Sequence, residues 1–202
     1  MTRGRRARLV VLVLLLLGLP AGAARAVTLL PLDLPQLTGR ADRIFVGRVE
    51  TVATGRDANG VPAVWTTFTV EQPLKGWTGS APDHVTLKQL GASFGGAAAP
   101  VVPNAMLPRY REGESVVLFV HPDSALGFTS PVGFGQGCFR IDERDGARTV
   151  ENDVGNANLA PVATAHTLPS TSGRALATGA ASAGPVPLAT FVARVQALVA
   201  AP

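Results

Sequence analysis

Three stretches of the chain alternate between two sets of side chains, and this alternation constrains the fold more than any other feature. The stretches cover residues 42–52, 63–72 and 84–90. One face of the second stretch carries Val64, Thr66, Phe68 and Val70. A two-residue period is typical of extended strands, and Asn59-Gly60, between the first two stretches, is a strong signal for a tight hairpin turn. The pattern predicts antiparallel β-structure.

Other segments extend this prediction. Residues 115–121 form a continuous apolar run, as expected of a central strand. Shorter strands are expected near residues 126–132, 137–143 and 147–151, with Asp145-Gly146 as the turn between the last two. Residues 91–108 are rich in Gly, Ala and Pro without periodicity, so we expect a functional or mobile loop there. Pro35 can open a single helical turn that ends near Gly39.

The first 26 residues have the features of a secretory signal peptide. A basic start with Arg3, Arg5, Arg6 and Arg8 precedes an apolar stretch over residues 9–19, and Ala24-Arg25-Ala26 offers a small-x-small cleavage site. The alternative is an uncleaved anchor, but the apolar stretch is shorter than the ~20 residues that span a bilayer. We therefore expect a secreted or periplasmic protein with no membrane span after cleavage behind Ala26.

The high content of basic residues does not indicate nucleic-acid binding. Five of the 18 basic residues lie in the predicted signal peptide, which leaves 13 basic against 14 acidic residues from Val27 onward. A nearly neutral chain without a Lys/Arg cluster lacks the charge that phosphate binding requires. Nucleic acid is therefore excluded as a partner.

The chain beyond the signal peptide divides into three parts. Residues 27–155 are expected to form one mainly β domain, followed by a flexible linker over residues 156–186 that is rich in Ala, Gly, Ser, Thr and Pro. Residues 187–200 have helical spacing of apolar residues, opened by Pro187. That spacing involves Leu188, Phe191, Val192, Val195, Leu198 and Val199. The C-terminal helix should pack on the β domain.

Few residues indicate chemistry. The segment Gly91-Ala92-Ser93-Phe94-Gly95 matches the G-x-S-x-G pattern of serine hydrolases, but prolines follow it where that pattern needs a helix. His84, His121 and His166 lack metal-ligand spacing. The single cysteine, Cys138, lies in an apolar run where burial is expected. We predict no catalytic residue, no metal and no cofactor.

Three segments together resemble the netrin-like domain of the tissue inhibitors of metalloproteinases. They are ADRIFVGRV at residues 41–49, TFTVEQPLKG at residues 67–76 and GESVVLFV at residues 113–120. The resemblance covers about residues 27–143. It implies a small OB/netrin-like barrel of five to seven strands, here followed by the C-terminal helix.

The resemblance also implies a mode of binding. In those inhibitors the N-terminal residue chelates the zinc of the protease, and the α-amine of Val27 would take that place here. The matching cysteine positions hold Val27, Leu29 and Gly39, so no disulfide orders the peptide. The predicted partner-binding residues are Val27, Thr28, Leu29 and Leu30, together with the loop over residues 91–108. The implied partner is a protein, with a metalloprotease as the class.

Two alternatives of other classes remain open. One is a small serine hydrolase that uses Ser93 with His121 or His166. The other is a structural envelope protein in which the β domain is a spacer. The leading prediction is a non-enzymatic, exported binding protein.

Overall fold

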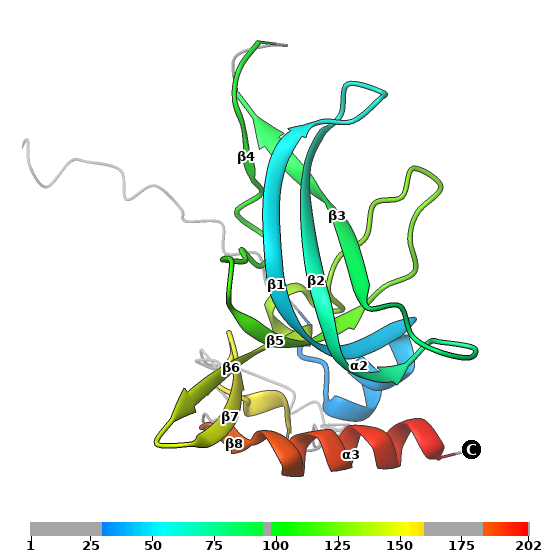
Figure 1. Cartoon of the computed structure of the whole chain (residues 1–202), viewed down its shortest axis with the longest axis vertical. Helices are drawn as coiled ribbons and strands as arrows, with labels where there is room; N and C mark the ends of the chain where they lie inside the picture. Colours follow the sequence, from blue (N-terminus) through cyan, green and yellow to red (C-terminus); the bar gives the residue numbers. More distant parts are fainter. Residues whose placement is uncertain (1–29, 95–97, 160–183, 202) are drawn as a thin grey trace, which may run out of the picture.

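The computed structural model describes residues 30–94, 98–159 and 184–201. Its described strands form one antiparallel sheet in the order β4-β3-β2-β1-β5-β6-β7-β8. The strands are β1 (Arg43–Arg56), β2 (Pro62–Lys75), β3 (His84–Ser93), β4 (Val101–Pro103), β5 (Ser115–Val120), β6 (Cys138–Arg144), β7 (Ala147–Asn152) and β8 (Val186–Pro187). With a C-terminal helix behind this sheet, the predicted mainly β class is confirmed (Figure 1).

The described helices are short except for the last one. They are α2 (Leu34–Arg40), η1 (Phe134–Gly137), η2 (Ala157–Leu159) and α3 (Leu188–Ala200). Helix α2 begins with a capping box, in which Asp33 accepts the amide of Gln36 at 2.8 Å and the Gln36 side chain accepts the amide of Asp33 at 3.1 Å. Lys75 donates to the carbonyls of Thr38 and Ala41 at the other end of this helix.

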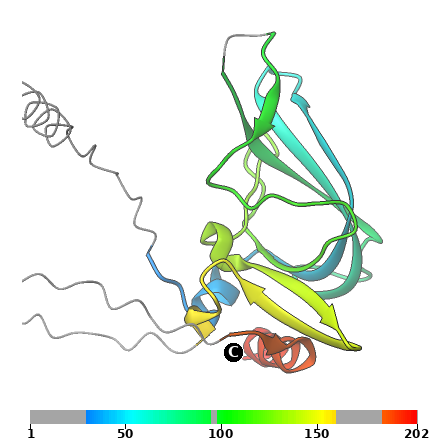
Figure 2. The same ribbon diagram turned by 90° about the vertical axis from the view of Figure 1, so that its left-hand side faces the viewer.

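The sheet curls strongly but does not close. Strands β1 and β2 form a long hairpin with three shifts of register, and such bulges bend and twist a sheet. Residues 126–132, predicted as a strand, make only isolated pairs, Lys88 with Phe128 and Val120 with Pro131. These pairs link β3 to β5 across the curl, whereas β4 and β8 end the sheet without pairing to each other (Figure 2).

Two apolar clusters lie on opposite faces of the central strands. Inside the curl, one cluster includes Phe45, Phe68 and Leu118, whereas the other face carries Ile44, Val117 and Phe119. Neighbouring residues of β1 and β5 therefore point to different cores. This arrangement explains why residues 115–121 read as a continuous apolar run.

Helix α3 covers the outer cluster, as its apolar spacing predicts. Phe191 and Val195 are fully buried, and the Phe191 ring lies 4.5 Å from the Phe139 ring and 6.2 Å from the Phe119 ring. Helix α2 contributes Leu34 and Leu37 to the same cluster. Both helices thus pack on one face of the sheet (Figure 1).

The predicted linker over residues 156–186 is packed at its described beginning, which corrects the expectation for that part. Asn156 is fully buried and Leu159 belongs to the outer cluster. The Asn156 amide donates to the carbonyls of Val150 and Gly184, each at 2.8 Å, so residues 156 and 184 lie side by side. Most of the segment, residues 160–183, lies outside the described residues, as do the predicted signal peptide and residues 27–29.

Candidate binding groove

An open groove of about 370 Å³ lies at the side of the curled sheet. It gathers residues from four segments: the end of β3, the chain between β4 and β5, the residues after β5, and the start of η1. Its principal lining residues are Leu90, Met106, Leu107, His121, Phe128 and Phe134. Most of these side chains are apolar, and Leu90 and Met106 remain half exposed. We call this surface the groove.

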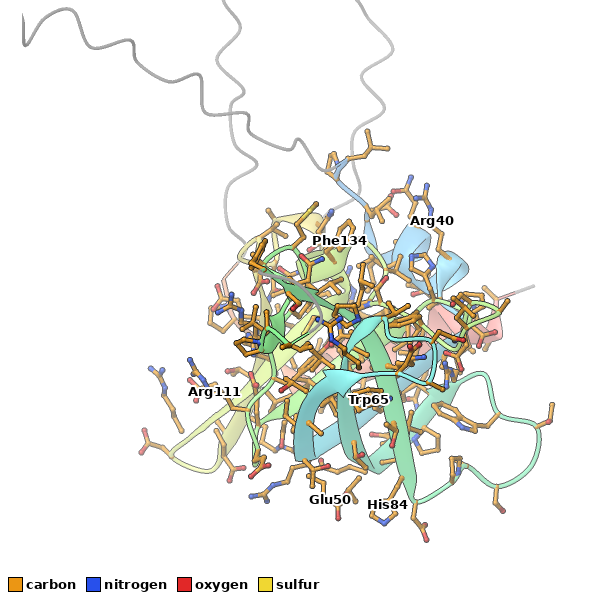
Figure 3. All side chains as sticks on the ribbon, turned by 90° about the horizontal axis from the view of Figure 1, so that it is seen from above. Arg40, Glu50, Trp65, His84, Arg111 and Phe134 are labelled. Atoms are coloured by element: carbon orange, nitrogen blue, oxygen red, sulfur yellow. The ribbon has the colours of Figure 1, made fainter. Side chains whose placement is uncertain are left out.

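A second hollow of about 180 Å³ adjoins the groove. It is lined by Leu30, Leu32 and Arg40 from the N-terminal part, and it shares His121 and Phe134 with the groove. Figure 3 shows Phe134 and Arg40 at one side of the molecule, at the opposite edge of the view from Glu50 and His84. The groove and this N-terminal hollow therefore form one continuous surface.

The Phe134 backbone is strained at the junction of the two hollows. Its φ of +56° lies in the left-handed region, which a bulky side chain rarely adopts. Gly133 precedes it with φ of +63°, and Phe134 is itself the first residue of η1. Strained backbone of this kind is found preferentially at binding and catalytic sites, and here it falls on one of the two residues that line both hollows.

Gln136 fixes the N-terminal segment next to this junction. Its side chain accepts the amide of Leu32 at 2.8 Å and donates to the carbonyl of Leu30 at 3.1 Å. Gln136 itself is buried, and its carbonyl accepts from Asn152. The side-chain amide thus pairs with the peptide as a neighbouring strand would.

Of the four predicted partner-binding residues, Leu30 is the one that the structure describes. Its side chain is 74% exposed at the rim of the N-terminal hollow. Val27, Thr28 and Leu29 lie outside the described residues. The predicted loop over residues 91–108 is more regular than expected, since β3 continues to Ser93 and pairs with β4. Its later residues, Met106 among them, line the groove.

Among the described residues, Ser93 has no base beside it of the kind that a serine nucleophile needs. It accepts a hydrogen bond from Arg56 at 3.0 Å and donates to the carbonyl of Ala99 at 3.2 Å. A guanidinium cannot act as the base that a serine nucleophile needs. The predicted helper His121 lines the groove, which Ser93 does not, and His166 lies outside the described residues.

The remaining titratable residues do not assemble a metal site within the described residues, where no group of three or more candidate ligands occurs. His84 pairs with Glu50 at 2.9 Å on the exposed surface. Cys138 is buried, as predicted, and burial raises the pKa of its thiol to about 12. Desolvation likewise raises the pKa of Tyr110 well above its usual range.

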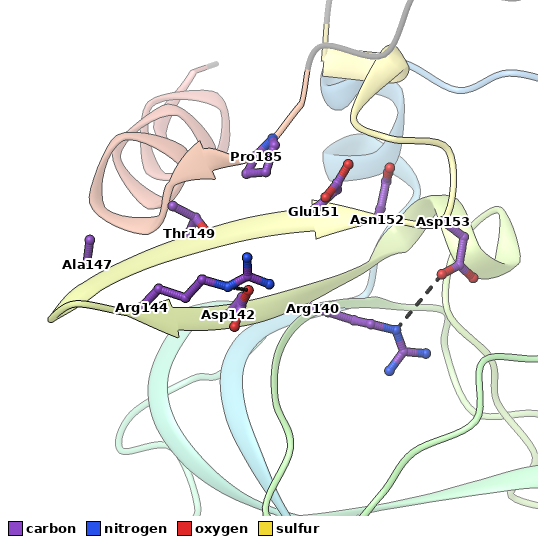
Figure 4. A pocket seen from close by; sticks show the side chains of 9 residues that line it. All are labelled: Arg140, Asp142, Arg144, Ala147, Thr149, Glu151, Asn152, Asp153 and Pro185. Atoms are coloured by element: carbon purple, nitrogen blue, oxygen red, sulfur yellow. Dashed lines mark ion pairs between the residues drawn. The ribbon is translucent and has the colours of Figure 1, made fainter.

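Another hollow, with a volume of about 550 Å³, lies along β6 and β7 and is lined mainly by charged and polar residues (Figure 4). Its two arginines already have carboxylate partners. Arg144 contacts Asp142 at 2.7 Å, and Arg140 contacts Asp153 at 4.0 Å and also pairs with Glu114. Because each arginine already pairs with a carboxylate, an anion would gain little binding free energy on this surface compared with remaining in water.

Comparisons with known proteins add no relative. A scan against models of known families and a search of curated proteins both found no match. Within the described part of the chain, no helix has the length and apolar character to cross a membrane.

Sequence reasoning missed the centre of the groove. Phe128 lies in an irregular segment and Phe134 begins the short helix η1, and nothing in their spacing relates them to Leu90 or Leu30. The isolated pair between Lys88 and Phe128 brings these segments together. The one signal in the sequence is the cluster of glycines around Phe134, because a left-handed turn favours glycine.

Proposed function

We propose that this is an exported, non-enzymatic binding protein that holds a protein partner across the groove and the N-terminal hollow. One observation carries the proposal. The two segments expected to bind, the N-terminal peptide and the chain after β4, border the same two residues, His121 and Phe134. An exposed apolar surface with a strained aromatic residue at its centre is typical of an interaction site.

The test uses the mature chain and three matched variants. Leu30→Asp and Met106→Asp place a charge on the two halves of the surface. Val154→Asp is the control, because Val154 is an exposed apolar residue that lines neither hollow. We expect the first two variants to lose capture of the partner and the third to retain it. Equal capture by all three would overturn the proposal.

A metalloprotease is the partner class that the resemblance implies, and it has its own test. The mature chain that begins at Val27 is compared with a version carrying one extra N-terminal alanine. If the α-amine of Val27 ligates the zinc, the added residue abolishes inhibition. Inhibition by neither form removes this partner class, while the capture experiment still decides whether the groove binds another protein.

A further inference from the structure

Within the described structure, the groove and the N-terminal hollow are lined by two basic side chains and by no acidic one. Arg40 and His121 line the N-terminal hollow, and His121 also lines the groove. All 14 acidic residues of the chain lie within the described ranges, and none of them lines either hollow. The surface is therefore apolar, with an uncompensated positive charge at the end that Arg40 occupies.

The acidic residues that are closest to Arg40 along the chain have other partners. Asp33 accepts the amide of Gln36 at the start of α2, and Asp42 contacts Arg43 at 3.6 Å. The Arg40 side chain has no ion pair and no hydrogen bond with a described residue. Its guanidinium carries five N–H donors, so these remain available to a ligand.

Arg40 is also not required to stabilise its own helix. It lies in the last turn of α2, where a basic side chain commonly bonds to the last carbonyls. Lys75 already does so, since its amine donates to the carbonyls of Thr38 and Ala41 at 2.7 Å each. The charge of Arg40 therefore has no structural partner at this end of the helix.

His121 provides a second donor where the two hollows meet. Its amide donates to the carbonyl of Ser130, and its own carbonyl accepts the hydroxyl of Thr129, so the backbone of this residue is held in place. Its ring has no hydrogen bond or ion pair with a described residue. An imidazole offers at least one N–H donor in either protonation state, which suits an acceptor that also contacts Arg40.

We propose that the protein segment held on this surface carries an Asp or Glu carboxylate that binds Arg40 and His121, while neighbouring apolar side chains of the same segment fill the groove. The inference rests on the proposed function, since it specifies the chemistry of the partner at the same surface. A carboxylate can accept two parallel hydrogen bonds from a guanidinium. A basic segment would meet an uncompensated charge of its own sign, so complementarity favours an acidic one.

The test is a selection from a library of random octapeptides displayed on phage, with the mature chain that begins at Val27 as the target. Because the library contains all compositions, the selected sequences report the charge preference directly. We expect them to carry Asp or Glu beside apolar residues and to be depleted in Lys and Arg. Selection of basic peptides, selection without a charge preference, or no selection at all would overturn the inference.

Matched variants identify the contact. Arg40→Gln removes the charge at an exposed position, so the affinity for a selected peptide should fall about tenfold, as expected for a lost hydrogen bond to a charged group. Arg111→Gln is the control, because Arg111 is exposed and lines neither hollow (Figure 3). Thermal unfolding checks that both variants fold. Wild-type affinity in Arg40→Gln would contradict the inference.

A change in the peptide completes the cycle. Replacing its Asp or Glu with Asn or Gln should lower the affinity of the wild-type protein by a similar factor and have little further effect in Arg40→Gln, because the two groups act as one pair. Fully additive losses would mean that the carboxylate and Arg40 do not interact, and this would overturn the inference.

Met106→Asn separates this inference from the proposed function, because it removes an apolar side chain of the groove without adding a charge. Lost peptide binding in Met106→Asn with unchanged binding in Arg40→Gln would overturn the inference alone and leave the groove as the binding surface. Unchanged binding in Met106→Asn would contradict the proposed function, even where Arg40→Gln still weakens the peptide. Weaker binding in both variants is the result that supports the two together.

Discussion

Burial makes Cys138 unreactive, and this can be measured at the level of a single residue. The raised pKa of about 12 keeps the thiol protonated at neutral pH, and the thiolate is the reactive form. We expect no reaction of the folded protein with Ellman's reagent within minutes, and one equivalent of thiol after denaturation. Val154→Cys supplies an exposed thiol as the positive control. Rapid labelling of Cys138 in the folded protein would contradict its buried position.

The stability of the turn between β1 and β2 depends on pH through the carboxylate of Asp57. Its carboxylate accepts from the amides of Asn59 and Val61 and from Lys88 at 2.8 Å, and the Lys88 hydrogen bond is the main cause that lowers the pKa of Asp57. A lowered pKa contributes stability above the usual carboxylate pKa of about 3.9, and this is lost as the pH falls through the folded value. The turn should therefore remain intact at pH 5.

The measurement is a pH titration of the Val61 amide chemical shift. In the wild type we expect the change to have its midpoint below the usual pKa of Asp57. In Lys88→Met the midpoint should move to higher pH, because the main cause of the lowered pKa is removed. Lys75→Met is the control, since Lys75 bonds to the end of α2 instead. An identical midpoint in Lys88→Met would contradict the coupling.

Some residues of the candidate site could be predicted from the sequence and others could not. Leu90 ends an alternating stretch, so its place on the sheet could be predicted, and Leu30 belongs to the peptide predicted to bind a partner. Met106 and Phe134 fall outside the alternating stretches, and their positions in the groove depend on contacts between distant parts of the chain, which a local pattern does not contain.

At the level of elements, the same division holds. Strands β1, β2, β3, β5, β6 and β7 were predictable, because alternation and turn residues act locally. Strands β4 and β8 have only three and two residues, each with a proline, and they exist because a neighbouring strand pairs with them. Residues 126–132 have the composition of a strand, but the turn at Ser124–Gly127 and Pro131 limit them to isolated pairs.

Gln136 determines how firmly the N-terminal segment is held. Replacing it with methionine leaves the amide of Leu32 and the carbonyl of Leu30 without their partner. We expect Gln136→Met to lower the free energy of unfolding by about 1–3 kcal/mol, the usual cost of unpaired buried polar groups, as measured by urea denaturation. Gln196→Met, on the exposed side of α3, should stay within about 0.5 kcal/mol. A similar small effect in both variants would mean that Gln136 does not anchor the segment.

The whole molecule depends on two apolar clusters that share the central strands. Because β1 and β5 contribute to both, loss of the outer cluster should destabilise the inner one. Helix α3 packs on the outer cluster, while β1 and β5 also carry the inner one. The C-terminal helix and the inner cluster are therefore linked through the stability of the same strands.

Phe191→Ala tests this linkage. The fully buried ring packs against Phe119 and Phe139, and removing such a ring typically costs about 3–5 kcal/mol. In a Trp65→Phe background, fluorescence reports on Trp77, which contacts Phe45 of the inner cluster at 6.0 Å. We expect helical circular dichroism and Trp77 fluorescence to shift to the same lower denaturant midpoint, while Thr190→Ala, exposed on α3, shifts neither. A Trp77 transition that stays at the wild-type midpoint would show that the two clusters unfold independently.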